Sequence, residues 1–172
     1  MSSSATEAHT GSRSLRIANI PGNPNDEYVN GITASHAKLT FWVWTDSTPA
    51  SSRTVVAWRD TSDNLLLEFV VGSAGGFAVV TSCEAEPQVV GVFAWTVETW
   101  TSVEIIFNDD TGFLSVDIGG SGPATRETGC TTQVENLAVV EDTAGTPVFF
   151  MDDFELTAIE AATVRPPIMR TQ

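Results

Sequence analysis

Basic residues are scarce in this chain. Its 172 residues include 8 lysines and arginines against 22 aspartates and glutamates, and the formal net charge is −14. Such a charge repels the phosphate backbone of nucleic acids and the anionic headgroups of lipids. We therefore expect neither nucleic acid nor a lipid surface as a partner.

Long apolar runs are also missing. No stretch approaches the roughly 20 apolar residues that cross a bilayer as a helix, and the first residues, MSSSATEAHTGS, lack the apolar centre of a signal peptide. We expect no membrane insertion. The length suits a single folded domain, which we place at residues 13–160, between a flexible N-terminal segment at 1–12 and a C-terminal tail or linker at 161–172.

Cysteine is limited to Cys83 and Cys130. Two cysteines are too few for a disulfide-dense scaffold and lie too far apart for a compact zinc motif. A bridge between them would close a long loop and contribute on the order of 3 to 5 kcal/mol in an oxidising compartment. We predict this disulfide and, with it, a secreted or cell-surface protein. The alternative is two unrelated thiols, one of them buried in a strand.

Alternation with period two is the dominant pattern. Short runs rich in Val, Ile, Phe, Trp and Thr are each bounded by Gly, Asn, Asp, Ser or Pro, which is typical of β-strands. The runs begin at or near Ser14, Lys38, Arg53, Leu65, Phe77, Val89, Ser102, Phe113, Glu135 and Val148. Residues 60–64 and 108–112 read as hairpin loops. We predict an all-β, two-sheet antiparallel sandwich with very little helix.

Three segments share features with one superfamily. Residues 11–17 read GSRSLRI, residues 100–120 read WTSVEIIFNDDTGFLSVDIGG, and residues 151–156 read MDDFEL. They resemble, in this order, an opening strand, a hairpin preceded by Trp and a closing strand with paired aspartates in the concanavalin A-like superfamily. That superfamily includes laminin-G-like domains, legume-type lectins and bacterial carbohydrate-binding or adhesin modules. The resemblance implies a jelly-roll sandwich.

The resemblance also implies a structural calcium. In related bacterial modules an aspartate at the position of Asp152 binds the ion, and Ca²⁺ takes six to eight oxygen ligands. Asp153 and Glu7 are the candidates that would help Asp152. The alternation places Asp152 on the same strand face as Phe150 and Phe154, where a carboxylate needs a partner. The alternative is an aspartate hydrogen-bonded as a loop cap.

Catalytic residues are hard to find. Glycoside hydrolases of the superfamily carry a Glu-x-Asp-x-x-Glu run and use two carboxyl groups about 5 to 5.5 Å apart. The nearest pair here, Asp153 and Glu155, does not lie in such a run. Histidine occurs only at positions 9 and 36, which leaves little for a Ser-His-Asp arrangement. We expect no enzymatic activity.

The tryptophans are the candidate ligand-binding residues. In KLTFWVWT, alternation places Trp42 and Trp44 on one face with polar neighbours, opposite an apolar face. A flat indole matches the apolar face of a sugar ring. We predict a sugar-stacking surface of Trp42, Trp44 and Trp58. The alternative assigns these residues to the core, which the alternation of Trp58 with Val56 favours.

These features predict a non-catalytic, extracellular, lectin-like module that binds a carbohydrate or glycoconjugate on a concave aromatic face. An alternative is a structural protein of a virion, pilus or cell surface, which would have a large apolar contact patch and bind protein partners or itself. An unusual hydrolase would have a cleft with paired carboxylates. The fold hosts all three classes.

Overall fold

Strands make up the regular structure of the part of the chain that the structure describes. The computed structural model describes residues 2–4, 8–10, 14–17, 27–34, 36–60, 62, 64–73, 76–83, 86, 88–131, 134–139 and 149–159. The strands are β1 (Ser2–Ser4), β2 (Ser14–Ile17), β3 (Glu27–Ala34), β4 (His36–Thr45), β5 (Arg53–Arg59), β6 (Leu65–Gly72), β7 (Gly76–Thr81), β8 (Gln88–Ala94), β9 (Thr101–Asn108), β10 (Phe113–Ile118), β11 (Ala124–Glu127), β12 (Val134–Val139) and β13 (Phe149–Ala158). The described residues include no helix with the length and hydrophobicity needed to cross a bilayer.

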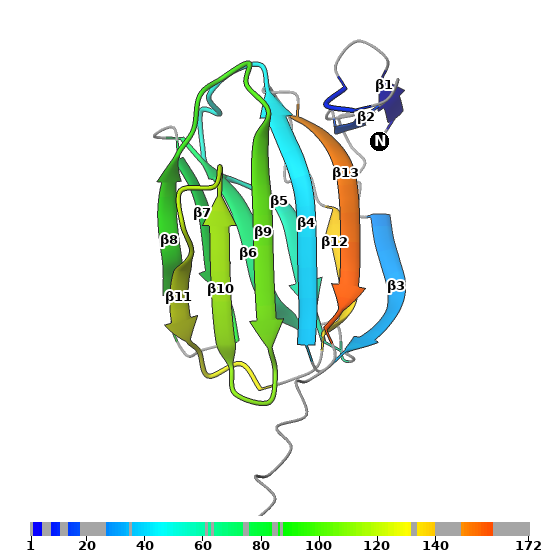
Figure 1. Cartoon of the computed structure of the whole chain (residues 1–172), viewed down its shortest axis with the longest axis vertical. Helices are drawn as coiled ribbons and strands as arrows, with labels where there is room; N and C mark the ends of the chain where they lie inside the picture. Colours follow the sequence, from blue (N-terminus) through cyan, green and yellow to red (C-terminus); the bar gives the residue numbers. More distant parts are fainter. Residues whose placement is uncertain are drawn as a thin grey trace, which may run out of the picture.

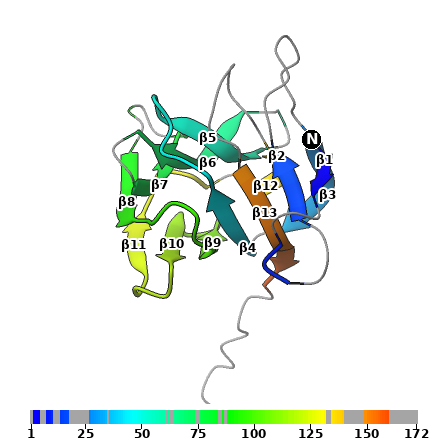
Figure 2. The same ribbon diagram turned by 90° about the horizontal axis from the view of Figure 1, so that it is seen from above.

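The strands form two antiparallel sheets that face one another (Figures 1 and 2). The first sheet has the order β1-β2-β13-β4-β9-β10-β11, and the second has the order β3-β12-β5-β6-β7-β8. Every strand expected from alternation is present, so the predicted all-β sandwich is confirmed. The strands that alternation did not predict, β1, β3 and β11, all lie at the edge of a sheet.

Side chains from both sheets fill the space between them. Leu39, Phe41 and Val43 of β4 are no more than 1% exposed, while the residues between them are half-buried on the outward face. This confirms the two faces predicted for the strand. Phe41 packs edge to face against Phe69 of β6, with ring centroids 5.3 Å apart. Burying such a side chain contributes about 1.5 to 3 kcal/mol.

A disulfide joins the two sheets. Cys83 follows β7 of the second sheet, and Cys130 follows β11 of the first. Their Cα atoms are 5.5 Å apart, within the range for a bridge. Cys130 is buried in the core. The predicted pairing is confirmed.

Both predicted hairpin loops are present. The carboxylate of Asp60 accepts hydrogen bonds from the backbone N–H groups of Ser62 and Asn64, at 2.8 and 2.9 Å, and so closes the turn between β5 and β6. Gly112, in the turn between β9 and β10, has φ of 68°. A Cβ there would lie 2.2 Å from the carbonyl oxygen of Thr128, so only glycine fits.

The N-terminal segment belongs in part to the first sheet. Residues 2–4 form β1 and pair with β2, and His9 and Thr10 bond to β13. These residues thus have contacts with the folded domain, and the prediction of a flexible segment at 1–12 stays a prediction. A strand of three serines has no apolar alternation, which is why the pattern missed it. The tail predicted at 161–172 lies outside the described residues.

Candidate functional site

Strand β13 carries one residue more than its partner β4. Between Asp152 and Glu155 of β13 lie two residues, whereas their partners on β4, Trp42 and Thr40, are separated by one. This arrangement is a β-bulge. Asp153, inside the bulge, has φ of 50°, a left-handed conformation that residues other than glycine rarely adopt.

The bulge corrects the predicted faces of β13. Phe149 and Met151 belong to the core before the bulge, and Phe154 and Leu156 pack against it after the bulge. Simple alternation placed Asp152 on the face of Phe154, but the extra residue reverses the order of faces. Asp152 instead lies on the outward side of the sheet, since directly paired residues share a face and its partner there is half-buried.

His9 and Thr10 lie against this bulge. Asp152 Oδ2 accepts hydrogen bonds from the backbone N–H groups of His9, at 2.8 Å, and Thr10, at 3.1 Å. Asp153 accepts a hydrogen bond from the Thr10 hydroxyl through Oδ1, and its Oδ2 lies 2.9 Å from Nδ1 of His9. The hydrogen bonds from Thr10 and then His9 lower the pKa of Asp153. Asp152 thus has the partner that a half-buried carboxylate needs.

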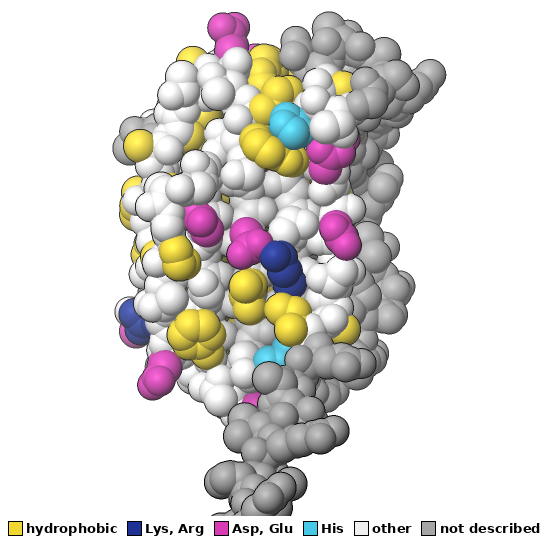
Figure 3. All heavy atoms as spheres, in the orientation of Figure 1, with side chains coloured by type: hydrophobic (Ala, Val, Ile, Leu, Met, Phe, Trp, Pro, Cys, Tyr) yellow, Lys and Arg dark blue, Asp and Glu magenta, His cyan; other side chains and the backbone are white. Residues whose placement is uncertain are grey.

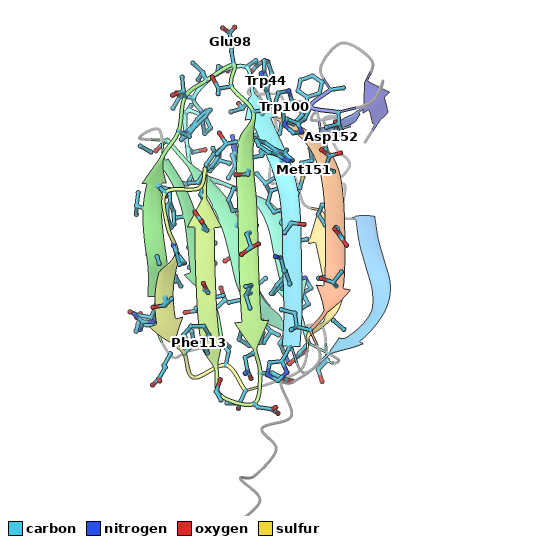
Figure 4. The ribbon with its side chains drawn as sticks, in the orientation of Figure 1. Trp44, Glu98, Trp100, Phe113, Met151 and Asp152 are labelled. Carbon is cyan, nitrogen blue, oxygen red and sulfur yellow. A yellow bond between two sulfur atoms is a disulfide. The ribbon has the colours of Figure 1, made fainter. Side chains whose placement is uncertain are left out.

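An aromatic cluster surrounds His9. Its imidazole stacks on the indole of Trp42, with centroids 3.7 Å apart and an interplanar angle of 16°. Trp100 meets the same imidazole edge-on, at 5.8 Å. Trp44, on the same strand face as Trp42, packs edge to face against Phe150, at 5.2 Å. Figure 4 shows Trp44, Trp100 and Asp152 together at the end of the first sheet where β13 begins.

An open groove of about 390 Å³ continues from Trp42 across the outward face of the first sheet. We name it the acidic groove. Its lining consists of Thr40, Phe41, Trp42, Ser102, Val103, Glu104, Asp117, Gly120, Asp153 and Glu155. Figure 3 shows acidic side chains gathered around a basic one across the middle of this face. The groove therefore joins an indole wall to several carboxylates.

Strand register aligns the polar side chains of the groove. Glu155 of β13 pairs with Thr40 of β4, Thr40 pairs with Glu104 of β9, and Glu104 pairs with Asp117 of β10. We call these residues the polar row. Directly paired residues on adjacent antiparallel strands have Cβ atoms about 4.5 to 5.5 Å apart. The row therefore presents oxygen atoms at close, regular spacing across four strands.

Positive charge near the groove is limited. Lys38 Nζ lies 2.5 Å from Glu104 Oε2, and His9 contacts Asp153. Asp117 accepts a hydrogen bond from the backbone N–H of Gly122, at 3.3 Å. None of the described residues that line the groove is basic. The groove thus has more carboxylates than cationic groups.

The predicted tryptophans have three different environments. Trp42 lines the acidic groove, as well as a second hollow of about 290 Å³ that includes Trp95 and Trp100. Trp44 is half-buried and lines neither the acidic groove nor the second hollow. Trp58 is only 2% exposed and packs in the core against Phe107, so its predicted role in ligand binding is wrong. Alternation shows that a strand has two faces without showing which one faces the second sheet.

The aspartates predicted to bind calcium form hydrogen bonds within the protein. Asp152 Oδ1 accepts the backbone N–H of Asp153, at 2.9 Å, so all four carboxylate oxygens of this pair already have protein partners. No group of three metal-ligating side chains occurs within the described part of the chain. Glu7 lies outside the described residues. The calcium site of Asp152, Asp153 and Glu7 stays a prediction.

Sequence reasoning did not find most of this site. Glu104, Asp117 and His9 entered none of the predicted ligand-binding or metal sets. Alternation alone places Glu104 opposite the apolar residues Val103 and Ile105 of its strand, which marks it as outward-facing. Nothing in the local sequence indicates that it lies beside Asp117, since that depends on the register between strands.

Comparison with known proteins identifies the fold. No family model and no curated protein matches the sequence. Among solved structures, the binding domain of botulinum neurotoxin serotype D is similar with a TM-score of 0.67 and 11% identity, covering 88% of this chain and 40% of that one. Alginate lyase AlyC3 has a TM-score of 0.64 and 14% identity, covering 84% of this chain and 74% of that one. A sialidase has a TM-score of 0.65 and 8% identity, covering 86% of this chain and 15% of that one.

These likenesses confirm the β-sandwich and do not identify a superfamily. The chain spans less than half of the neurotoxin and sialidase chains that it resembles. At this level of identity, the shared property is the fold.

Proposed function

We propose that this chain is a non-catalytic glycan-binding module whose ligand lies in the acidic groove. The observation that carries the proposal is the position of the Trp42 indole beside the polar row, two residues along β4 from Thr40 and on the same strand face. An indole stacks on the apolar face of a sugar ring, while carboxylates accept hydrogen bonds from its hydroxyl groups. One aromatic surface with a few convergent polar groups is the usual composition of a small-ligand site.

The polar row also departs from what stability alone favours. Glu104 and Asp117 are paired directly across two strands, and like charges in this position are destabilising. The ion pair with Lys38 offsets part of this repulsion. Departures from local stability rules are expected at functional sites. A ligand that donates hydrogen bonds to both carboxylates would relieve the remaining cost.

The solved neighbours are consistent with this proposal. One is AlyC3 in complex with dimannuronate, and another is the binding domain of botulinum neurotoxin DC in complex with SialylT. Identity to this chain is 14% for the first complex and 12% for the second. They support the proposal as examples of what this sandwich can carry.

We propose a binding role because none of the carboxylates that line the acidic groove has the surroundings of a general acid. A glycosidase keeps one carboxyl group protonated in an apolar pocket near its second carboxylate. Glu104 is instead paired with Lys38. On the same open surface, Asp117 is half-buried and Glu155 is exposed. Incubation with oligosaccharides is expected to give no cleavage products by mass spectrometry.

Substitution of two tryptophans on the same strand face tests the site. Trp42→Ala should weaken retention on a panel of immobilised polysaccharides by at least about tenfold, because stacking and contact area worth more than about 1.4 kcal/mol are lost. Trp44→Ala is the matched control, since Trp44 is half-buried on the same face but does not line the groove. Equal retention by both variants and the unchanged protein would refute the proposal.

The second candidate function, self-association, has one specific observation in its favour. The outward side of β6, β7 and β8 forms an open hollow of about 610 Å³. Its apolar side chains, which we call the apolar face, are Val70, Ala78, Val80, Val89, Val92 and Ala94. Val92 is 76% exposed and Val89 is 52% exposed. Contiguous apolar surface of this kind often marks a contact between proteins.

This second function is compatible with the first because the apolar face and the acidic groove lie on different sheets. We propose a second copy of this chain as the occupant of the apolar face. Light scattering should then give a dimer mass that Val92→Lys converts to a monomer mass. A monomer for the unchanged protein across the micromolar range would exclude this role.

The disulfide supports a location outside the cytosol. Bridges such as Cys83–Cys130 form and persist in oxidising compartments. We propose a secreted or surface-displayed module, which is where glycan ligands are accessible. Detection of the bridge in protein isolated from its native source would test this location.

A further inference from the structure

We infer that the acidic groove selects glycans that carry no acidic groups. This inference rests on the proposed function and names the class of ligand that the groove accepts. The side chains that line the groove determine the sign of its charge.

The charges that face a ligand in the groove are mainly negative. Glu155, Glu104 and Asp117 occupy three of the four positions of the polar row, and Asp153 lies next to the row in the bulge. The ammonium group of Lys38 is already engaged with Glu104, and the imidazole of His9 contacts Asp153. A carboxylate on a ligand would therefore meet like charge along most of the groove.

Hydrogen bonding leads to the same conclusion. An ionised carboxylate is an acceptor with no proton to donate. Sugar hydroxyls donate to it and form strong, charge-assisted hydrogen bonds. A uronate or sialate carboxylate offers no such donor at neutral pH and adds repulsion. Replacing one hydroxymethyl group of a sugar by a carboxylate should thus change the interaction from favourable to unfavourable.

The field of the whole molecule adds to this selection. The net charge of −14 slows the approach of any polyanionic chain at low ionic strength. The AlyC3 complex shows that a similar sandwich is compatible with an acidic sugar, dimannuronate. The fold therefore does not dictate the preference, and the residues of the polar row do.

The test uses pairs of oligosaccharides with the same backbone. Each pair joins a neutral chain to its C6-oxidised counterpart of equal length and linkage: β-1,4-mannan oligosaccharide with β-1,4-oligomannuronate, and cello-oligosaccharide with β-1,4-oligoglucuronate. For any backbone that is bound, calorimetry should give at least about tenfold tighter binding of the neutral member at low salt. The ratio should shrink in about 1 M salt, where screening acts within a few ångströms.

Variants assign the selection to the polar row. Asp117→Asn and Glu155→Gln keep an acceptor oxygen and remove a charge, so each should reduce the preference for the neutral member severalfold. Glu98→Gln is the matched control, because Glu98 is exposed on a loop at the end of the molecule (Figure 4) and does not line the groove.

The outcomes separate this inference from the function on which it rests. Equal or tighter binding of the acidic member would overturn the inference and leave glycan binding intact. A preference that persists unchanged in high salt and in both variants would also overturn it, since it would then arise from shape. The proposed function itself would be overturned if no member of any pair bound and if Trp42→Ala, Trp44→Ala and the unchanged protein were retained equally on the polysaccharide panel.

Discussion

The imidazole of His9 stacks in parallel on the indole of Trp42, with ring centroids 3.7 Å apart. The contact joins residues far apart in sequence and ties the N-terminal segment to a strand in the middle of the first sheet. It also means that one face of the Trp42 indole is already covered. A sugar in the acidic groove must therefore contact the edge or the remaining face of Trp42.

Removal of this stack should be measurable. His9→Ala should lower the free energy of unfolding by about 1 kcal/mol, the contribution of an aromatic pair, and shift tryptophan emission to longer wavelength as the indole gains water. His36→Ala is the matched control because His36 makes none of these ring contacts. Unchanged emission in His9→Ala would show that the imidazole does not cover the indole in solution.

A second prediction concerns Asp109, in the loop between β9 and β10. Asp109 is 4% exposed, and burial, followed by the nearby charge of Asp110, raises its pKa. Ionisation is therefore easier in the unfolded chain than in the folded one. Asp109 thus destabilises the fold increasingly as the pH rises above the ordinary pKa of an aspartate. Below that value the carboxyl group is protonated in both states and the cost disappears.

Asp109→Asn should accordingly raise the melting temperature at pH 7 and have a smaller effect near pH 3. Asp110→Asn, an exposed neighbour in the same turn, is the comparison. Thermal unfolding followed by circular dichroism at both pH values is the measurement. An equal shift at pH 3 and pH 7 would mean that charge is not the cause.

A third prediction concerns the disulfide. Cys83 and Cys130 are 47 residues apart in sequence, and the entropy of closing such a loop corresponds to about 4 kcal/mol. Reduction, or the double variant Cys83→Ala with Cys130→Ala, should lower the free energy of unfolding by about 4 kcal/mol. Denaturant titration with and without reductant gives the value. If reductant lowers the stability of the double variant as well, the effect does not come from this bridge.

A fourth prediction concerns calcium. Because the oxygens of Asp152 and Asp153 already accept protein hydrogen bonds, millimolar Ca²⁺ or EDTA should leave the melting temperature within about a degree. A rise with Ca²⁺ that Asp152→Asn abolishes would instead support the site predicted from the resemblance. The same measurement on Glu7→Gln would then show whether Glu7 helps to bind the ion.

The limits of sequence reasoning are clearest in β4 and β13. In β4, strict alternation predicted how the side chains divide between two faces, since a regular strand turns every second residue to the same side. In β13 the same reasoning failed at Asp152, because a bulge adds one residue and reverses the faces that follow. The bulge depends on the pairing with β4 and on contacts from His9 and Thr10, none of which is local.

The amino-acid sequence by itself determined the strands with apolar alternation, the cysteines available for a bridge, the surplus of negative charge and the two faces of the strand that carries Trp42. These properties depend on neighbours a few residues away. Only the tertiary structure decided that Trp58 faces the core, that His9 lies on Trp42, and that Glu155, Thr40, Glu104 and Asp117 form one row. The physical reason is register: antiparallel pairing between distant strands sets which side chains meet, and a shift of one residue would scatter them to opposite faces.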